Sequence, residues 1–265
     1  MGDVLVAHPG VRMVTFTGSR QVGARIKAQS GLKKVTLELG NSSPNIVHSD
    51  ADLDLAARLL AYKAFASAGQ SCISVQRIYV HKDVAAAFEA KMKEAVSRLK
   101  VGDPEDGDTD VGPLITVQEA ERVESWVEEA VAQGARRVSG GERNGPVIQP
   151  VLLADVRPEM RVCKEEVFGP VASLSVYERL EQAIELANET VYGLQAGIFT
   201  SDIRTAWKAA QALEFGGVII NDASSFRADL MPYGGVKESG LGREGPRYAV
   251  EEMTELRAVI FSSLQ

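Results

Sequence analysis

Residues 11–39 read VRMVTFTGSRQVGARIKAQSGLKKVTLEL, and this segment decides the fold. Residues 11–16 form an apolar run that predicts a short buried strand, and residues 35–39 predict another. Between these runs, apolar residues at helical spacing predict a helix over residues 20–28. A strand, a helix and a second strand in succession are the repeating unit of a parallel sheet covered by helices.

The turn before this helix contains a glycine pair. Gly18 and Gly23 have the spacing G-x-x-x-x-G at the start of the helix, where free backbone N–H groups can hold a phosphate. The alternative is a strand-to-helix turn that binds no ligand, because a glycine pair alone is a weak signal. The sequence of the turn leaves both interpretations open.

The same alternation continues along the rest of the chain. Further strands are predicted at residues 44–47, 77–81, 147–156, 169–177, 196–200, 217–221 and 258–262. Helices are predicted from a cap at Ser49 or Asp50 to near Gly69, after Asp83, and over residues 116–134, 179–188 and 202–214. This alternation predicts an α/β fold with a mainly parallel sheet.

Composition argues against several classes of protein. The 265 residues are 45% apolar, which is enough for a full hydrophobic core. A formal net charge of -7 argues against nucleic acid or an anionic membrane as a partner. No apolar run approaches the roughly 18–20 residues that span a bilayer, and the first residues lack the features of a signal peptide. Two distant cysteines and three scattered histidines indicate neither a disulfide framework nor a metal site, so we expect a cytoplasmic protein.

Cys72 is the strongest candidate for a catalytic nucleophile. It lies in the sequence AGQSCIS, residues 68–74, after a predicted amphipathic helix. The glycine and serines of this loop give a polar setting, and a nucleophilic thiolate needs partial exposure and a lowered pKa. Backbone N–H groups near the cysteine would serve as oxyanion donors. The alternative is an inert buried thiol, which is the commoner state of a cysteine and the one expected for Cys163.

Two acidic residues flank Cys72 in the sequence. Glu38 lies in the predicted strand at residues 35–39, on the face opposite its leucine neighbours. It would act as a general base that activates a water against a thioester, if the fold brings it near Cys72. Glu166 precedes a Gly-Pro turn, and its carboxylate would accept hydrogen bonds from a sugar. The alternative for both residues is an ordinary solvated acid.

Five motifs, taken together and in order, resemble the NAD(P)-dependent aldehyde dehydrogenase superfamily from residue 14 to about residue 261. The motifs are Phe16-Thr17-Gly18-Ser19, Leu37-Glu38-Leu39-Gly40, Gly69-Gln70-Ser71-Cys72, Glu166-Val167-Phe168-Gly169-Pro170 and Pro232-Tyr233-Gly234-Gly235-Val236-Lys237-Glu238-Ser239-Gly240. Five motifs in this order are highly specific.

The resemblance implies a role for each site residue. Cys72 would be the nucleophile and Glu38 the general base. The residues expected to bind NAD or NADP are Gly18 and Ser19 at the pyrophosphate, Leu39 at the nicotinamide end through its backbone, Glu166 at the nicotinamide ribose and Phe168 beside the ring. The implied reaction oxidises an aldehyde to a carboxylic acid through a thiohemiacetal and a thioester on Cys72.

The sequence departs from the family in two ways. Asn41 stands where the family commonly has a second glycine. The family's N-terminal portion, with further strands of the cofactor domain, an oxyanion-hole asparagine and a lysine for the adenosine ribose, has no counterpart, so the chain resembles a truncated member. We expect a remnant of a Rossmann-like cofactor domain at residues 1–40, an α/β catalytic domain at 41–243 and an oligomerisation arm at 244–265. Weak NAD(P) binding and impaired oxidation are the expected consequences.

The resemblance also concerns substrate and partners. A small-molecule aldehyde is the expected substrate, and Arg227 would meet a carboxylate or phosphonate on it, unless this arginine is only solvated. Residues 258–261 resemble the family's terminal strand, which adds to a neighbouring subunit's sheet, so we expect a homo-oligomer, a dimer or a tetramer. The alternative function is a catalytically silent or esterase-only protein that mainly self-associates.

Overall fold

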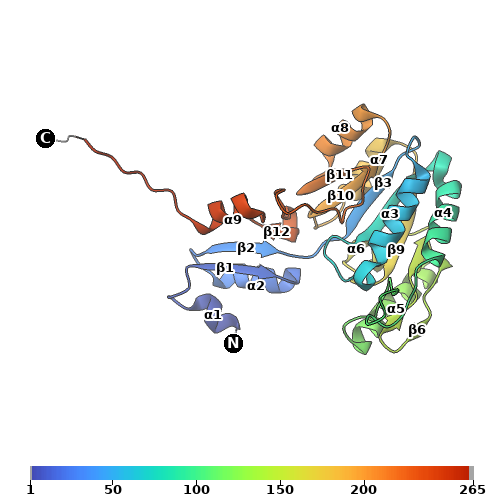
Figure 1. The fold of residues 1–265 in the computed structure, drawn as a ribbon, viewed down its shortest axis with the longest axis horizontal. Helices are drawn as coiled ribbons and strands as arrows, with labels where there is room; N and C mark the ends of the chain where they lie inside the picture. Colours follow the sequence, from blue (N-terminus) through green and yellow to red (C-terminus); the bar gives the residue numbers. More distant parts are fainter. Residues whose placement is uncertain (1, 263–265) are drawn as a thin grey trace.

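Two main sheets of unequal size form the framework of the computed structural model, which describes residues 2–262 (Figure 1). From edge to edge, the large sheet contains β11 (Gly217–Ile220), β10 (Gln195–Phe199), β3 (Ser43–Val47), β4 (Val75–His81), β9 (Val171–Tyr177), β8 (Val151–Ala154) and β5 (Arg136–Ser139). Its neighbouring strands are parallel, apart from β5, which is antiparallel to β8. The predicted α/β fold with a mainly parallel sheet is confirmed.

Helices cover both faces of the large sheet (Figure 1). One face carries α3 (Leu53–Phe65), α4 (Ala85–Ser97), α5 (Val117–Ala132) and the short α6 (Arg161–Lys164), and the opposite face carries α7 (Leu180–Asn188) and α8 (Ile203–Ala212). Ile46 and Val47 are adjacent in β3 and fully buried, but they belong to the cores on opposite faces because side chains alternate across a strand. None of the described helices combines the length and the apolar character that crossing a bilayer requires.

Shorter elements connect these layers. They are the 3-10 turns η1 (Ala66–Gly69), η2 (Lys82–Val84) and η3 (Lys237–Ser239), and the hairpin of β6 (Arg143–Asn144) and β7 (Val147–Ile148). The strand expected over residues 147–156 is therefore divided between β7 and β8.

The small sheet contains β1 (Met13–Thr17), β2 (Lys34–Glu38) and β12 (Gly240–Leu241). β1 and β2 are parallel, and α2 (Arg20–Gln29) connects them, which confirms the predicted strand–helix–strand unit. α1 (Gly2–Ala7) packs beside α2, while α9 (Pro246–Met253) lies on the other face of the sheet (Figure 1). The expectation that residues 11–16 are buried is wrong, because β1 is an edge strand whose residues are half-buried or exposed.

The predicted cap of α3 is also wrong. Asp52, not Ser49 or Asp50, caps this helix, and its carboxylate accepts hydrogen bonds from the first backbone N–H groups of α3. The Asp50 carboxylate instead accepts hydrogen bonds from the backbone N–H groups of Ser201 and Asp202, just before α8. Asp50 therefore ties the end of β3 to a helix on the opposite side of the sheet.

The strand expected at residues 258–262 is absent. These residues are exposed and extend away from both sheets (Figure 1), so no neighbouring strand of the described chain pairs with them. Residues 263–265 of the expected arm lie outside the described residues.

Candidate active site

A cleft of about 550 Å³ lies between the two sheets. It is lined by Thr17, Gly18, Ser19, Glu38, Leu39, Gly40, Gln70, Ser71, Cys72, Glu166 and Phe168. All the residues predicted to be catalytic or cofactor-binding are among them. The cleft joins the carboxyl end of β2 to the loops that precede β3, β4 and β9, which are neighbours in the large sheet.

The loop that carries Cys72 begins with strained backbone. Ser67, Ala68 and Gly69 have φ angles of 53°, 54° and 70°, so the chain reverses sharply after α3. A side chain at Gly69 would overlap the carbonyl oxygen of Gly169, in the loop that carries Glu166. The Cys72 and Glu166 loops are thus in direct backbone contact, and only glycine fits at position 69.

Cys72 is half-buried at the wall of the cleft. Its sulfur lies 3.4 Å from the hydroxyl oxygen of Tyr233. Burial raises the pKa of the thiol, the carboxyl groups of Glu166 and Glu38 raise this pKa further, and the hydrogen bond with Tyr233 opposes the shift. Cys72 thus has the partial exposure that a nucleophile needs, while its surroundings raise the pKa of the thiol rather than lower it. Cys163 is buried as expected.

Glu38 ends β2 and is buried, with 4% of its surface exposed. Neither carboxylate oxygen has a hydrogen-bond partner among the described residues. Desolvation, aided by the charge of Glu244, raises the pKa of Glu38 to about 8. The alternative interpretation of a solvated surface acid is therefore wrong for this residue. A buried, unpaired carboxyl that faces a cleft is typical of a general base or acid.

The segment that precedes β3 holds the Glu166 carboxyl group in place. Its Oε1 accepts a hydrogen bond from the backbone N–H of Asn41 at 3.0 Å, and a side chain at Gly40 would overlap its other oxygen. Burial raises the pKa of Glu166 to about 7. Phe168, two residues further on, is 42% exposed and has a φ angle of 47°. This loop therefore presents a carboxyl group and an aromatic ring to the same cleft.

The start of α2 forms the far end of the cleft. Ser19 caps the helix, and its Oγ accepts a hydrogen bond from the backbone N–H of Val22 at 3.4 Å. Gly18 precedes it and donates its N–H to the carbonyl of Glu38. Gly23 does not line the cleft, because its Cα packs against the side chain of Leu39. Of the predicted glycine pair, only Gly18 reaches a possible phosphate position.

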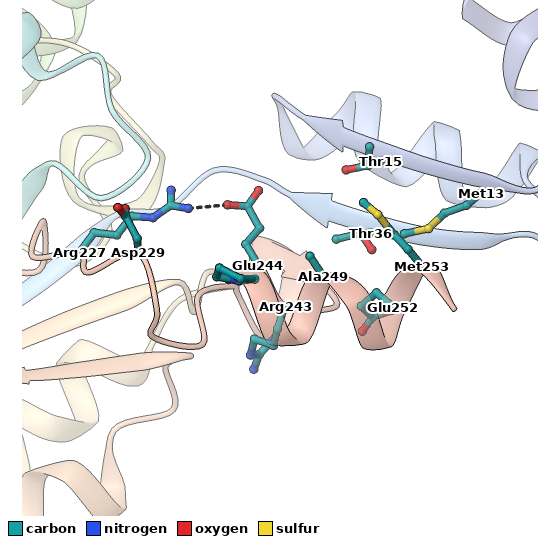
Figure 2. A pocket seen from close by; sticks show the side chains of 12 residues that line it. Met13, Thr15, Thr36, Arg227, Asp229, Arg243, Glu244, Ala249, Glu252 and Met253 are labelled. Carbon is teal, nitrogen blue, oxygen red and sulfur yellow. Dashed lines mark hydrogen bonds and ion pairs between the residues drawn. The ribbon is translucent and has the colours of Figure 1, made fainter. Parts of the chain in front are cut away.

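Arg227 lies outside this cleft. It lines a second cavity of about 360 Å³, between the β1–β2 face and α9, and Figure 2 shows its guanidinium pointing toward Glu244. Arg227 Nη2 donates to Glu244 Oε2 at 2.8 Å, and the guanidinium carbon lies 4.1 Å from the ring centre of Tyr233. Because Tyr233 contacts Cys72, Arg227 is separated from the sulfur by one side chain.

Two contributors to the site have no role that the sequence predicts. Tyr233 belongs to the motif at residues 232–240, but the sequence does not indicate that its hydroxyl reaches Cys72. Asn41 is, in the sequence, only a departure from the family. Its side-chain nitrogen donates to Ser43 Oγ at 2.8 Å and to the carbonyl of Gln195 at 3.2 Å, so the amide fastens the segment that holds Glu166.

Metal ligands do not gather in the part of the chain that the structure describes. Residues 2–262 contain no group of three or more His, Cys, Asp or Glu side chains placed to hold a metal ion.

Sequence comparison finds relatives over nearly the whole chain. The model of the aldehyde dehydrogenase family matches residues 1–259. The 3-sulfolactaldehyde dehydrogenase of Priestia megaterium is 52% identical over 262 residues, which are 99% of this chain and 55% of that protein. The lactaldehyde dehydrogenase of Methanocaldococcus jannaschii is 47% identical over 262 residues, which are 99% of this chain and 56% of that protein.

Solved structures agree with these matches. The crystal structure of glyceraldehyde-3-phosphate dehydrogenase from Methanocaldococcus jannaschii in complex with NADP has a TM-score of 0.96 and 46% identity, and the match covers 99% of this chain and 57% of that chain. The NADP complex of NADP-dependent glyceraldehyde-3-phosphate dehydrogenase from Bacillus halodurans has a TM-score of 0.94 and 41% identity, covering 97% and 54%. The chain thus spans about half the length of the curated relatives it matches.

Proposed function

Because this chain belongs to the aldehyde dehydrogenase family, we propose that it oxidises an aldehyde to a carboxylic acid with NAD or NADP, using Cys72 as nucleophile and Glu38 as general base. The single observation that supports these roles best is the shared cleft, in which both residues and Glu166 face the same space.

The first half of the proposed reaction takes place on the sulfur of Cys72. The thiolate attacks the aldehyde carbon and forms a thiohemiacetal, whose oxygen carries the negative charge. Backbone N–H groups beside Cys72 are the donors at hand for this oxygen. Loss of a hydride from the thiohemiacetal carbon leaves a thioester, and a bound NAD or NADP supplies the acceptor for that hydride.

The second half depends on Glu38. Its carboxylate removes a proton from a water molecule, and the resulting hydroxide attacks the thioester carbonyl. The C–S bond then breaks, the carboxylic acid leaves, and Cys72 returns to the thiolate. Both Glu38 oxygens are buried and have no hydrogen-bond partner among the described residues, which supports this role because no other group occupies the carboxylate.

The residues of the cleft fit the nicotinamide and pyrophosphate end of a dinucleotide. Ser19 and Gly18 lie at the N-terminus of α2, where backbone N–H groups and the helix dipole favour a phosphate. The Glu166 carboxyl has one oxygen bonded to Asn41, and its second oxygen is available to a ribose hydroxyl. The backbone of Leu39 and the exposed ring of Phe168 line the part of the cleft proposed for the nicotinamide ring.

We also propose that this chain binds the dinucleotide weakly on its own. Its small sheet has three described strands, whereas dinucleotides are normally bound across a doubly wound sheet made of two βαβαβ halves. The proposed units remain residues 1–40 for the cofactor, 41–243 for catalysis and 244–265 for association, although β12 from the second unit pairs with β2 of the first.

For the substrate, we propose a small aldehyde with an anionic group. Relatives are named for 3-sulfolactaldehyde and glyceraldehyde-3-phosphate, which are molecules of that kind. Arg227 lies outside the cleft but only one side chain from the Cys72 sulfur, and it is the candidate that meets the anion because its bond to Glu244 uses one of five guanidinium N–H groups. On this proposal, Arg227→Gln raises KM for an anionic aldehyde more than for a neutral aldehyde of similar size.

Hydrolysis of 4-nitrophenyl acetate tests the nucleophile without any cofactor. Cys72→Ser should reduce the rate to that of buffer, because the serine hydroxyl is a far weaker nucleophile than the thiolate. Cys163→Ser is the matched control and should retain the wild-type rate, since Cys163 is buried outside the cleft. Equal rates for Cys72→Ser and the wild type would show that Cys72 is not a working nucleophile.

A second candidate function is an esterase-only or silent protein that mainly self-associates. The exposed apolar side chains of Val259, Ile260 and Phe261 favour it, because such a segment can add to a neighbouring sheet. Calorimetric titration with NADP separates the two functions. Binding together with aldehyde-dependent NADPH formation supports the dehydrogenase, and ester hydrolysis without either supports the alternative.

A further inference from the structure

The hydroxyl of Tyr233 is the polar group in contact with the sulfur of Cys72. The two atoms are 3.4 Å apart, and Tyr233 is buried, with 4% of its surface exposed. The hydrogen-bond partner of this buried hydroxyl among the described residues is the Cys72 sulfur.

Two residues, Glu244 and Arg227, fix the ring of Tyr233 in this position. The backbone N–H of Tyr233 donates to the carbonyl of Glu244 at 3.1 Å, and the N–H of Glu244 donates back at 2.6 Å. The side chain of Glu244 holds Arg227, and the guanidinium of Arg227 lies over the Tyr233 ring (Figure 2 shows the ion pair). Each of Tyr233, Glu244 and Arg227 therefore contacts the other two, which holds the Tyr233 ring in place.

The surroundings of the sulfur are otherwise unfavourable to a thiolate. The carboxyl of Glu38 faces it from β2, and the carboxyl of Glu166 faces it from the loop before β9. Arg227 and Arg243 are the cationic groups whose charges act on Glu38, but Arg227 is paired with Glu244, and Arg243 donates to backbone carbonyls. Among the described residues, the side chain that shares a hydrogen bond with the sulfur is Tyr233, and either atom can be the donor while both keep their protons.

We propose that Tyr233 is a further catalytic residue, which donates its hydroxyl hydrogen to the Cys72 thiolate and thereby stabilises and orients the nucleophile. A thiolate has no proton, so the hydroxyl must be the donor in the reactive state. Burial raises the pKa of Tyr233, and the tyrosine keeps its proton when the thiol has lost its own. The proposal rests on the proposed function, in which Cys72 attacks the aldehyde.

The test is the pH dependence of Cys72 alkylation by iodoacetamide, measured by mass spectrometry on the peptide that contains Cys72. Tyr233→Phe removes the donor and keeps the ring. We expect the midpoint of its profile to rise by about one pH unit, and the rate near pH 8 to fall about tenfold. Tyr79→Phe is the matched control, because it also removes a buried, hydrogen-bonded hydroxyl but not one in the cleft. Its profile should match that of the wild type.

A second replacement tests the same hydrogen bond while keeping the hydroxyl in place. Tyr233→3-fluorotyrosine makes the hydroxyl more acidic and a stronger donor, so the midpoint should move down rather than up. If the role of Tyr233 were purely structural, the two replacements would not shift the midpoint of Cys72 alkylation in opposite directions.

Profiles of both Tyr233 variants that coincide with that of the wild type would overturn the proposal. Alkylation needs neither aldehyde nor dinucleotide, so a shifted profile in a chain without dehydrogenase activity would leave the role of Tyr233 standing and count against the proposed function alone.

Discussion

Glu38 is a buried carboxyl group whose oxygens have no hydrogen-bond partner among the described residues. A carboxylate in this position loses its hydration and gains no hydrogen bond in return, which raises the pKa of Glu38 to about 8. In the proposed reaction it acts as a base only after losing its proton. The site is therefore poised to work best in mildly alkaline solution.

Deacylation should depend on pH through the ionisation of Glu38. The rate of thioester or ester turnover should rise as pH increases through about 8, because the fraction of ionised Glu38 rises there. Glu38→Gln should abolish this rise of the rate with pH and slow turnover by about 10²–10⁴-fold. Steady-state rates from about pH 6 to 9.5 check this, with Glu165→Gln, a neighbour of Glu166 that does not line the cleft, as control. A rising limb that persists in Glu38→Gln would assign the titration to another group.

The same carboxyl group affects stability with a predictable sign. Its pKa is raised in the folded protein, so the folded state binds more protons than the unfolded state between pH 4.5 and about 8. The free energy of unfolding must then fall as pH rises through this window, by up to about 1.4 kcal/mol per pH unit. Glu38→Gln should show a smaller fall. Denaturant unfolding at about pH 5, 6.5 and 8 measures the difference between the two proteins.

For single residues, the sequence predicts which residues belong to the site better than it predicts which of them are in contact. The motifs single out Cys72, Glu38 and Glu166, and these residues do share one cleft. The contact between Tyr233 and Cys72 is invisible in the sequence, because it joins positions 161 residues apart through a side-chain oxygen. The pKa of Cys72 is raised rather than lowered, since sequence alone gives neither its burial nor the approach of two carboxyl groups.

At the scale of elements, a substitution can test the junction between the loops of Gly69 and Gly169. Gly69→Ala adds a methyl group against the carbonyl of Gly169 at a φ angle of 70°, so the loops must separate. We expect a loss of more than about 1 kcal/mol in the free energy of unfolding and slower alkylation of Cys72.

Gly145→Ala provides the control for that substitution. Gly145 also has a positive φ angle, 58°, but a methyl group there would meet nothing within 4 Å. It should show only the backbone cost, about 1 kcal/mol, and unchanged alkylation. Equal effects of the two substitutions would show that the contact between the loops is unimportant.

Most helices and strands follow from local patterns, and the errors have identifiable causes. α2 and the longer helices of the large sheet are predictable because each has apolar residues at helical spacing, whereas the sequence pattern does not predict α1, α6 and α9. The cap prediction fails at Asp50 because caps are inferred from nearby sequence, whereas the partners of Asp50 lie about 150 residues away. Residues 258–262 have the apolar character of a strand, but a strand needs a neighbour that pattern alone does not provide.

At the scale of the whole molecule, the exposed tail supports the proposal of a homo-oligomer. The exposed fractions of Leu256, Val259, Ile260 and Phe261 are 105%, 69%, 86% and 73%. We expect the Ile260→Asp, Phe261→Asp double variant to have a lower molar mass than the wild type in light scattering, because charges oppose strand addition. A matched double variant at exposed Val4 and Leu5, on α1, should keep the wild-type mass. A tail variant with unchanged mass would show that this segment does not hold subunits together.

The proposed base and nucleophile belong to different sheets. Glu38 ends β2 of the small sheet, Cys72 precedes β4 of the large one, and the chain crosses between them at residues 39–42 and again near β12. A rotation of one sheet against the other would therefore change the gap between carboxyl and sulfur while leaving each residue's own strand intact. Substitutions along these two crossings can alter turnover without touching any atom that reacts.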